Sequence, residues 1–208
     1  MLFRSGIDVT RTPVNMRAIS RVIEGSGQMS GDYREHRRLQ QAKAGPMKIS
    51  EAFTFCGSDK CTLHHYGPFY DGLVETLKPR TVLEVGVHKG ASLRAWRHVG
   101  YAVEAIGIDR QRVEGVPMIV ATAPDFGPAL TQLEGRRFDL IIDDGSHVLS
   151  HQLAAVDQLR DLLEPGGYFV VEDLQGQAAI DAFRMRGWSF FDRRELGRYD
   201  DVIAFQQF

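Results

Sequence analysis

The chain has 208 residues and a formal net charge of -2, from 25 Lys and Arg against 27 Asp and Glu, which suits one α/β domain with a modest extension and excludes two full enzymatic domains. The lack of a basic excess argues against nucleic acid or an anionic membrane as a partner. Two cysteines are too few for a disulfide scaffold, and no apolar run resembles a signal peptide or approaches the roughly 20 residues of a membrane span, so we expect a cytoplasmic protein.

The first part of the chain, residues 1–48, is rich in Arg, Gln, Gly and Ser, and we predict that it forms an N-terminal arm. Two interpretations stay open. The arm is either a partly ordered tail with a short helix near Tyr33 to Ala44, or a segment that binds a partner or mediates homo-oligomerisation. Residues 49–208 are predicted to form the main domain.

From Ile49 onward, apolar runs of strand length alternate with longer amphipathic stretches, the pattern of a parallel sheet with crossover helices. The predicted strands are Thr81–Val87, Glu104–Asp109, Pro117–Thr122, Phe138–Asp143 and Gly167–Asp173. Helices are predicted at residues 91–100 and from residue 147 to a stop at residues 165–167. Residues 188–208 read as a closing hairpin. The predicted fold class is α/β, a doubly wound, Rossmann-like sheet.

The first two strands carry features of a nucleotide-binding end. Glu84 lies inside the first strand, and Gly86 and Gly90 stand in the turn after it, where glycine lets the backbone approach a ligand. Asp109 ends the second strand, where its carboxylate could accept hydrogen bonds from both hydroxyls of a ribose or cap a turn. The glycine spacing does not fit G-x-G-x-x-G, which disfavours a nicotinamide-dependent oxidoreductase.

These features together resemble the class I S-adenosylmethionine (SAM) methyltransferases. The resemblance implies that the glycine turn holds the methionine part of SAM and that the second acid holds its ribose, which assigns Glu84, Gly86, Gly90 and Asp109 to the cofactor. Many members also place an acidic residue after the third strand, against the adenine. Asp125 is the candidate here, and a helix-capping role is the alternative.

Acidic residues also end the fourth and fifth predicted strands, at the sheet edge where ligands bind. Asp144, Glu172 and Asp173 are expected to converge there, and an all-oxygen set suits Mg²⁺ or a similar hard cation. The alternative is a group of caps and surface ion pairs. His147 could accept the proton of an acceptor hydroxyl whose pKa the metal lowers, or serve as a structural histidine. His151 is more simply a polar contact in the first helical turn.

The segments "SDKCTLHHYGPFYDGL", "IIDDGSHVLSHQ" and "LEPGGYFVVEDL" sharpen the resemblance. They are similar to the metal-dependent O-methyltransferases that act on deoxysugars of macrolide antibiotics, the mycinamicin-type family. The resemblance implies that Asp144, Glu172 and Asp173 bind Mg²⁺ and that His147 is the general base. It also implies a further set of residues beside the cofactor: Asp59, Lys60, His65, Tyr66, Tyr70 and Asp143.

A zinc site is a competing interpretation of one segment, because Cys56, Cys61, His64 and His65 lie close together in the sequence. Their spacing is not a familiar closed zinc pattern, which disfavours it.

Only the short stretch "LQGQAAIDAFRMRG" follows the fifth strand, where sugar-modifying relatives carry a long insertion, so the acceptor pocket should be open unless the arm or a neighbouring subunit covers it. We predict a SAM-dependent, Mg²⁺-assisted O-methyltransferase that acts on a hydroxyl of a sugar or natural product, a small molecule or a glycan. The alternative is a non-catalytic binding protein that uses a methyltransferase-like scaffold. The cost of an acidic cluster without a ligand favours the enzyme.

Overall fold

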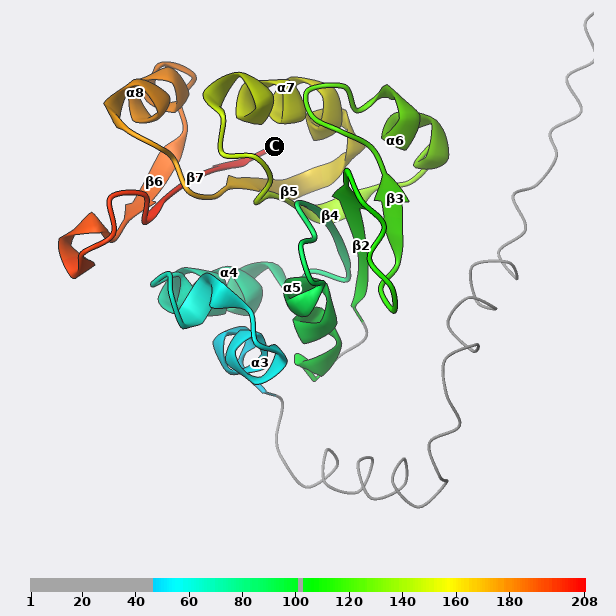
Figure 1. The fold of residues 1–208 in the computed structure, drawn as a ribbon, viewed down its shortest axis with the longest axis horizontal. Helices are drawn as coiled ribbons and strands as arrows, with labels where there is room; N and C mark the ends of the chain where they lie inside the picture. The colour runs from blue at the N-terminus through cyan, green and yellow to red at the C-terminus, as the bar shows by residue number, and fades with distance from the viewer. Residues whose placement is uncertain (1–46, 101–102) are drawn as a thin grey trace, which may run out of the picture. The chain divides into compact units, whose positions relative to one another are not determined.

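A computed structural model of the chain describes residues 47–100 and 103–208. This part contains a seven-stranded sheet with helices on both faces (Figure 1). The strands are β1 (Thr81–Val85), β2 (Glu104–Asp109), β3 (Met118–Val120), β4 (Phe138–Asp143), β5 (Leu163–Val171), β6 (Ser189–Asp192) and β7 (Val202–Gln207). The predicted arm lies outside the described residues except for Met47 and Lys48, and so does the helix predicted near residues 33–44.

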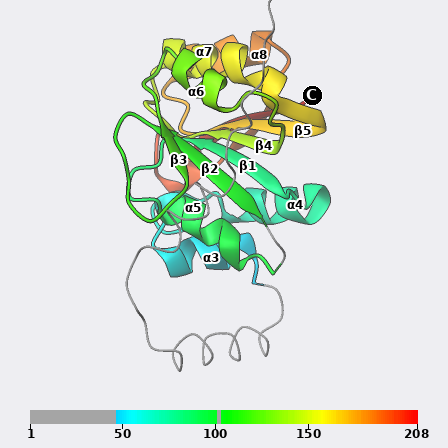
Figure 2. The same cartoon turned by 90° about the vertical axis from the view of Figure 1, so that its right-hand side faces the viewer.

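The helices form two layers, one on each side of the sheet (Figure 2). One layer contains α3 (Ile49–Cys56), α4 (Gly67–Leu77) and α5 (Ala91–Ala95), with the short 3₁₀ turns η1 (Asp59–Cys61) and η2 (Trp96–His98). The other contains α6 (Gly127–Gln132), α7 (Leu149–Leu159) and α8 (Gln177–Met185), with η3 (Arg160–Leu162) after α7; η4 (Arg194–Leu196) lies between β6 and β7. No helix within the described residues has the length and apolar character needed to cross a bilayer.

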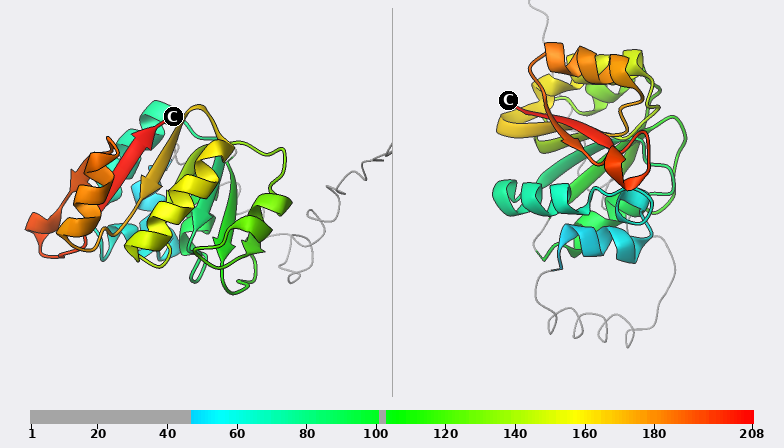
Figure 3. Two further views of the ribbon diagram at one scale, coloured as in Figure 1. Left: turned by 90° about the horizontal axis from the view of Figure 1, so that it is seen from above. Right: turned by 90° about the vertical axis from the view of Figure 1, so that its left-hand side faces the viewer.

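The strand order β3-β2-β1-β4-β5-β7-β6 confirms the predicted α/β fold with an antiparallel closing hairpin (Figure 3). Strands β1 to β5 pair in parallel, whereas β7 runs antiparallel to both β5 and β6. The chain order of the strands reverses between β1 and β4. In sheets of this kind, ligands bind outside the carboxyl ends of the strands beside such a reversal.

Apolar side chains cover both faces of the central strands, which explains why these strands read as continuous apolar runs. Val82 and Leu140 pack in a cluster with α3, α4 and α5, while their neighbours Leu83 and Ile141 pack in a second cluster with α6, α7 and α8. This alternation follows from the period of two along a strand. The sheet is therefore rigidly held from both sides, and its carboxyl edge can position side chains accurately.

The predicted boundaries are right for β2 and β4 and differ elsewhere. The predicted helix before β5 was to end at residues 165–167, but α7 ends at Leu159 and β5 already begins at Leu163. Pro165 is tolerated inside the strand because the pairing register of β4 and β5 shifts between Phe138 and Leu140, and proline fits at such an irregularity.

Candidate active site

A cleft of about 1330 Å³ opens at the carboxyl edge of the parallel strands. Its walls are the turns that follow β1 to β5, together with residues 57–59 and His64 before α4, and Arg198 and Asp200 before β7. The cleft lies at the reversal of strand order described above, which is the expected position for a ligand site in this architecture.

Gly86 brings the turn after β1 against the turn after β4. A Cβ atom on Gly86 would lie 1.9 Å from the backbone oxygen of Asp144, and its φ of +88° is favourable only for glycine. The amide of Gly86 also donates to the Ile108 carbonyl at 2.8 Å. Gly90, φ +73°, is not among the described residues that line the cleft, so it shapes the turn instead.

Asp109 lines the cleft and also organises the glycine turn. One carboxylate oxygen accepts hydrogen bonds from the amides of Val87 at 2.8 Å and His88 at 3.0 Å, and the other accepts from Gln111 at 3.1 Å. Burial acts to raise the pKa of Asp109, but these amides outweigh it and hold the pKa below its ordinary value. The carboxylate is therefore charged and fixed at the mouth of the turn.

Glu84 is a buried carboxylate on the wall of the cleft, with no exposed surface. Neither of its oxygens has a hydrogen-bond partner within the part of the chain that the structure describes, although the Lys60 ammonium lies 3.4 Å from Oε1. Burial raises the pKa of Glu84 to about 7. Buried polar atoms are rarely left unpaired in native proteins, so this carboxylate points to a ligand with a donor group.

Asp144, His147 and Asp173 converge at the end of the cleft. One carboxylate oxygen from each acid and one ring nitrogen of His147 lie within 4.8 Å of one another. The Nε2 atom of His147 is 3.8 Å from Asp173 Oδ2, and its Nδ1 atom is buried without a partner among the described residues. The structure thus brings two of the three predicted metal ligands together with the predicted base.

Glu172, the third predicted metal ligand, lines the same cleft but is turned toward Lys60. The Lys60 Nζ atom lies 2.8 Å from both Glu172 oxygens and 2.5 Å from Asp144 Oδ2, and the Tyr70 hydroxyl donates to Glu172. Burial alone would lower the pKa of Lys60, but the carboxylates of Asp144, Glu172 and Glu84 raise it overall. Lys60 is therefore a charged ammonium held between acids from β1, β4 and β5.

Four residues predicted to lie beside the cofactor are not among the described residues that line the cleft: Lys60, His65, Tyr66 and Tyr70. Each of them instead contacts the carboxylate of a buried acid. The Tyr66 hydroxyl donates to Asp173, and its pKa is raised, chiefly by burial. His65 Nδ1 lies 2.7 Å from the carboxylate of Asp201. From this segment, the predicted contact Asp59 does line the cleft.

Asp143, also predicted beside the cofactor, is 3% exposed and is likewise not among the described lining residues. Its Oδ1 atom accepts from the Gly145 amide at 3.1 Å, so the carboxyl group caps the turn that carries Asp144. Burial raises the pKa of Asp143 to about 7.

Asp143→Asn should therefore stabilise the protein at neutral to alkaline pH. Because the folded pKa lies above the unfolded value near 4, the folded state retains a proton that the unfolded state loses, and stability falls as pH rises from about 4 to about 7. The variant should melt at a higher temperature than the wild type at about pH 8, with a smaller gain at about pH 5. Asp161→Asn, at a side chain 91% exposed, is the control. Equal changes for Asp143→Asn at both pH values would contradict this account.

Backbone strain also gathers at the cleft. His88, His147 and Asp173 line it and have φ of +47°, +56° and +54°. Left-handed backbone costs about 1–2 kcal/mol for a residue other than glycine and is found most often where function requires it. The strain falls on the predicted base and on a predicted metal ligand.

One group of residues beside this centre was not predicted from the sequence. Ligand atoms of His64, Asp200 and Asp201 lie within 4.8 Å of one another, all three residues are buried, and Arg198 forms ion pairs with both acids. The sequence carries one weak signal of this group. The pair "DD" directly before the last strand repeats the pair "DD" found at the end of β4.

The remaining candidates have structural roles. Asp125 Oδ1 accepts a hydrogen bond from the Gly127 amide at 2.9 Å, as expected if Asp125 caps the helix that begins there. Asp125 is not among the described residues that line the cleft. His151 Nδ1 lies 2.8 Å from Ser146 Oγ. Burial raises the pKa of the Cys61 thiol to about 11, so the metal-free thiol is protonated near neutral pH. Within the described residues, neither cysteine belongs to a group that could hold a metal.

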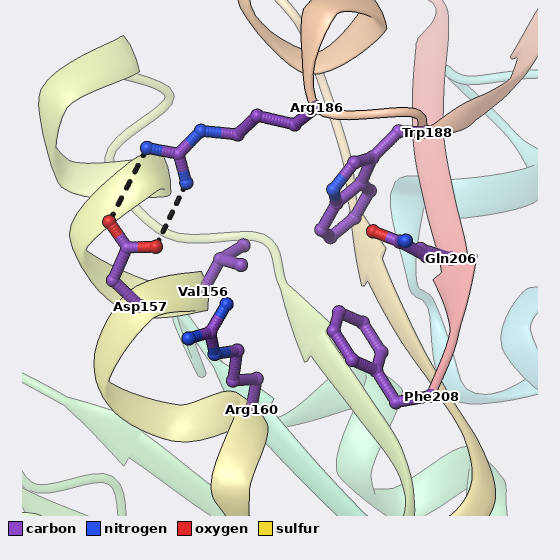
Figure 4. A pocket seen from close by; sticks show the side chains of 7 residues that line it. All are labelled: Val156, Asp157, Arg160, Arg186, Trp188, Gln206 and Phe208. Carbon is purple, nitrogen blue, oxygen red and sulfur yellow. Dashed lines mark hydrogen bonds and ion pairs between the residues drawn. The ribbon is translucent and has the colours of Figure 1, made fainter.

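A second hollow, of about 380 Å³, shares no lining residue with the cleft (Figure 4). Its wall contains an ion pair between Arg186 and Asp157, and its aromatic side chains are Trp188 and Phe208. Phe208 follows β7, which runs antiparallel to β5 with Gln207 opposite Tyr168 and Ala204 opposite Val171, and this places the hollow toward the opposite edge of the sheet. No group of metal-binding residues within the described chain lies there.

No protein-family model matches the chain. Over 137 residues it is 37% identical to 8-demethyl-8-alpha-L-rhamnosyl tetracenomycin-C 2'-O-methyltransferase of Streptomyces olivaceus, a match that covers 57% of this chain and 35% of that protein. Over 129 residues it is 33% identical to demethylmacrocin O-methyltransferase of Streptomyces fradiae, covering 54% and 32%. The chain thus spans about a third of the length of these relatives.

Among solved structures, the chain is similar to MycE methyltransferase from the mycinamycin biosynthetic pathway, in complex with Mg and SAH (S-adenosylhomocysteine). The TM-score is 0.61 at 23% identity, covering 78% of this chain and 55% of that one. This likeness shows a shared fold. The resemblance predicted from the sequence motifs is confirmed twice. The similar curated proteins are sugar O-methyltransferases, and the fold is shared with a methyltransferase structure.

Proposed function

We propose that this chain is a SAM-dependent, Mg²⁺-assisted O-methyltransferase whose acceptor is a hydroxyl of a sugar-bearing small molecule or glycan. The observation that carries the proposal is the convergence of Asp144, His147 and Asp173 at one end of a cleft whose other walls are the Gly86 turn and Asp109. The similarity to O-methyltransferases of sugar-bearing natural products supports the same class of acceptor.

The cofactor end of the cleft fits SAM through two carboxylates. Asp109 stands at the end of β2 with its oxygens fixed by backbone amides, where it would accept hydrogen bonds from the ribose hydroxyls. Glu84 lies 3.4 Å from the Lys60 ammonium but has no hydrogen-bond partner within the described chain, so its buried carboxylate could accept from the ammonium group of the methionine part. SAM, when bound, supplies a methyl group on a positively charged sulfur.

The acidic end fits a divalent cation because negative charge exceeds positive charge. Three carboxylates, those of Glu84, Asp144 and Glu172, contact one buried ammonium, that of Lys60, and Asp173 adds a fourth acid beside Asp144. Asp144 and Asp173 would hold the ion, as oxygen ligands suit Mg²⁺, and Glu172 would join them by turning away from Lys60. The cation, when bound, supplies positive charge that lowers the pKa of the acceptor hydroxyl.

His147 is the base in this proposal. Its Nδ1 atom is buried, so Nε2 is the nitrogen that receives the proton from the acceptor hydroxyl. Asp173, 3.8 Å from Nε2, would stabilise the imidazolium that forms. The left-handed backbone of His147 holds the ring at this position at the end of the cleft.

Asp144→Asn should weaken the binding of Mg²⁺, which tests the proposal. We expect transfer of a labelled methyl group from SAM to L-rhamnosides to require Mg²⁺, and the variant to need at least about 10-fold more Mg²⁺, the loss typical even of residues that only support a metal ligand. Asp161→Asn, on the surface, should behave as the wild type. Full activity after chelation of divalent ions would remove the metal from the mechanism.

A further inference from the structure

We propose that Asp200 forms a subsite that binds a second hydroxyl of the acceptor, beside the hydroxyl that receives the methyl group. This inference rests on the proposed function and deepens it, because it assigns the acceptor at least two hydroxyls in close proximity. Its basis is a buried carboxylate oxygen that lines the cleft and has no partner among the described residues.

The turn that carries Asp200 is fixed by its neighbour Asp201, which is fully buried. The Asp201 carboxylate lies 2.8 Å from His64 Nδ1 and 2.7 Å from His65 Nδ1, and 3.4 Å from Arg198 Nε. These contacts attach the turn before β7 to the segment between η1 and α4. Asp201 therefore has partners for both oxygens and serves as an anchor.

Asp200 is 6% exposed, and only one of its two carboxylate oxygens has a hydrogen-bond partner among the described residues. Its Oδ2 atom accepts from Arg198 Nη2 at 3.1 Å, and its backbone carbonyl accepts from the Tyr66 hydroxyl at 3.2 Å. The Oδ1 atom has no hydrogen-bond partner in the described chain. Leaving such an atom unpaired is costly, which indicates that a ligand donates to it.

The subsite adjoins the reaction centre. His64 Nδ1 lies 3.3 Å from Asp173 Oδ1, and one ring nitrogen of His64 lies within 4.8 Å of a carboxylate oxygen of Asp200. A ligand group at Asp200 would therefore belong to the same small molecule as the group bound at Asp173. A sugar-like ring carries several hydroxyls, so one molecule can supply a donor to each of the two carboxylates.

A neutral donor fits this place better than a second cation. By distance alone His64, Asp200 and Asp201 could hold a metal ion. The Arg198 guanidinium already forms ion pairs with both acids, however, and Asp201 is also paired with two histidines. A hydroxyl needs only the one free acceptor, Asp200 Oδ1.

The test uses methyl α-L-rhamnopyranoside as the probe, titrated into the full chain saturated with S-adenosylhomocysteine and Mg²⁺. Asp200→Ala should weaken binding of the probe by about 10-fold or more, the loss typical of one hydrogen bond to a charged group. Asp200→Asn should behave alike, because its oxygen would stay with Arg198 and its NH₂ group, which cannot accept, would face the cleft. The control is Asp192→Ala, since Asp192, like Asp200, pairs with an arginine two positions away in the sequence but is exposed.

Affinity for S-adenosylhomocysteine should be the same in all variants, and this separates the two proposals. If the wild type binds S-adenosylhomocysteine but not the probe, or if both Asp200 variants bind the probe as tightly as the wild type, the subsite is disproved. A second equivalent of bound Mn²⁺ that disappears in Asp200→Ala would make it a cation site instead. No binding of S-adenosylhomocysteine to the wild type would overturn the proposed function itself.

Discussion

Replacing Lys60 with methionine is expected to lower the free energy of unfolding by about 3–5 kcal/mol when no divalent metal is present, the range found when one partner of a buried ion pair is removed. The Lys60 side chain is 1% exposed and its ammonium contacts Glu84, Asp144 and Glu172. Methionine fills similar space but leaves these three carboxylates without a counter-charge. Protonation of Glu84 or Glu172 would reduce this loss of stability, because burial already raises the pKa of both carboxyl groups.

The measurement is denaturant unfolding of the variant and the wild type, each with chelator and with Mg²⁺. The structure predicts that Mg²⁺ stabilises Lys60→Met much more than the wild type, since the ion would replace the missing charge. Lys78→Met, at an exposed lysine, should change neither value. A loss below about 1 kcal/mol would show that Lys60 is not the charge that holds the acids together.

Replacing His147 with asparagine is expected to lower the rate of methyl transfer by about 10²- to 10⁴-fold, the contribution typical of a general base. Asparagine is chosen because it adopts left-handed backbone more readily than alanine, and φ at His147 is +56°. The amide cannot accept a proton near neutral pH, so the acceptor hydroxyl would lose its base. Binding of S-adenosylhomocysteine should be unchanged within about twofold, since no assigned cofactor contact is removed.

The checks are the turnover rate and the cofactor affinity measured on the same sample. His151→Asn is the matched control: His151 lines the same cleft but bonds to Ser146, and its loss should cost little. Equal loss of cofactor binding and turnover in His147→Asn would mean that His147 acts structurally, and unchanged turnover would remove it from the reaction.

Sequence patterns located the sheet and the acids of the site because both depend on local signals. The apolar run of β4 ends at Asp143 as predicted, and parallel topology then brings its end beside the end of β5. The convergence of Asp144 with Asp173 follows from that topology. Likewise, Gly86 was identified from its position in a turn, and the contact it permits with Asp144 explains why glycine is needed.

Contacts between distant segments could not be read from the sequence. Lys60 meets Glu172 across 112 residues of chain, and His64 meets Asp201 across 137. The motifs predicted that Lys60 lies at the site, but they did not predict that its ammonium lies between the acids. Glu172 was predicted as a metal ligand, and only the packing of η1 against the sheet shows that its carboxylate faces an ammonium.

The central claim is that the cleft binds SAM with a metal beside it. Calorimetric titration of S-adenosylhomocysteine into the full chain, with Mg²⁺ and again after chelation, tests it without knowledge of the acceptor. We expect binding at micromolar concentration, on the order of 8 kcal/mol of binding free energy, and loss of that binding in Asp109→Ala. No binding in either condition would contradict the enzyme and favour a protein that uses this fold as a scaffold for binding partners.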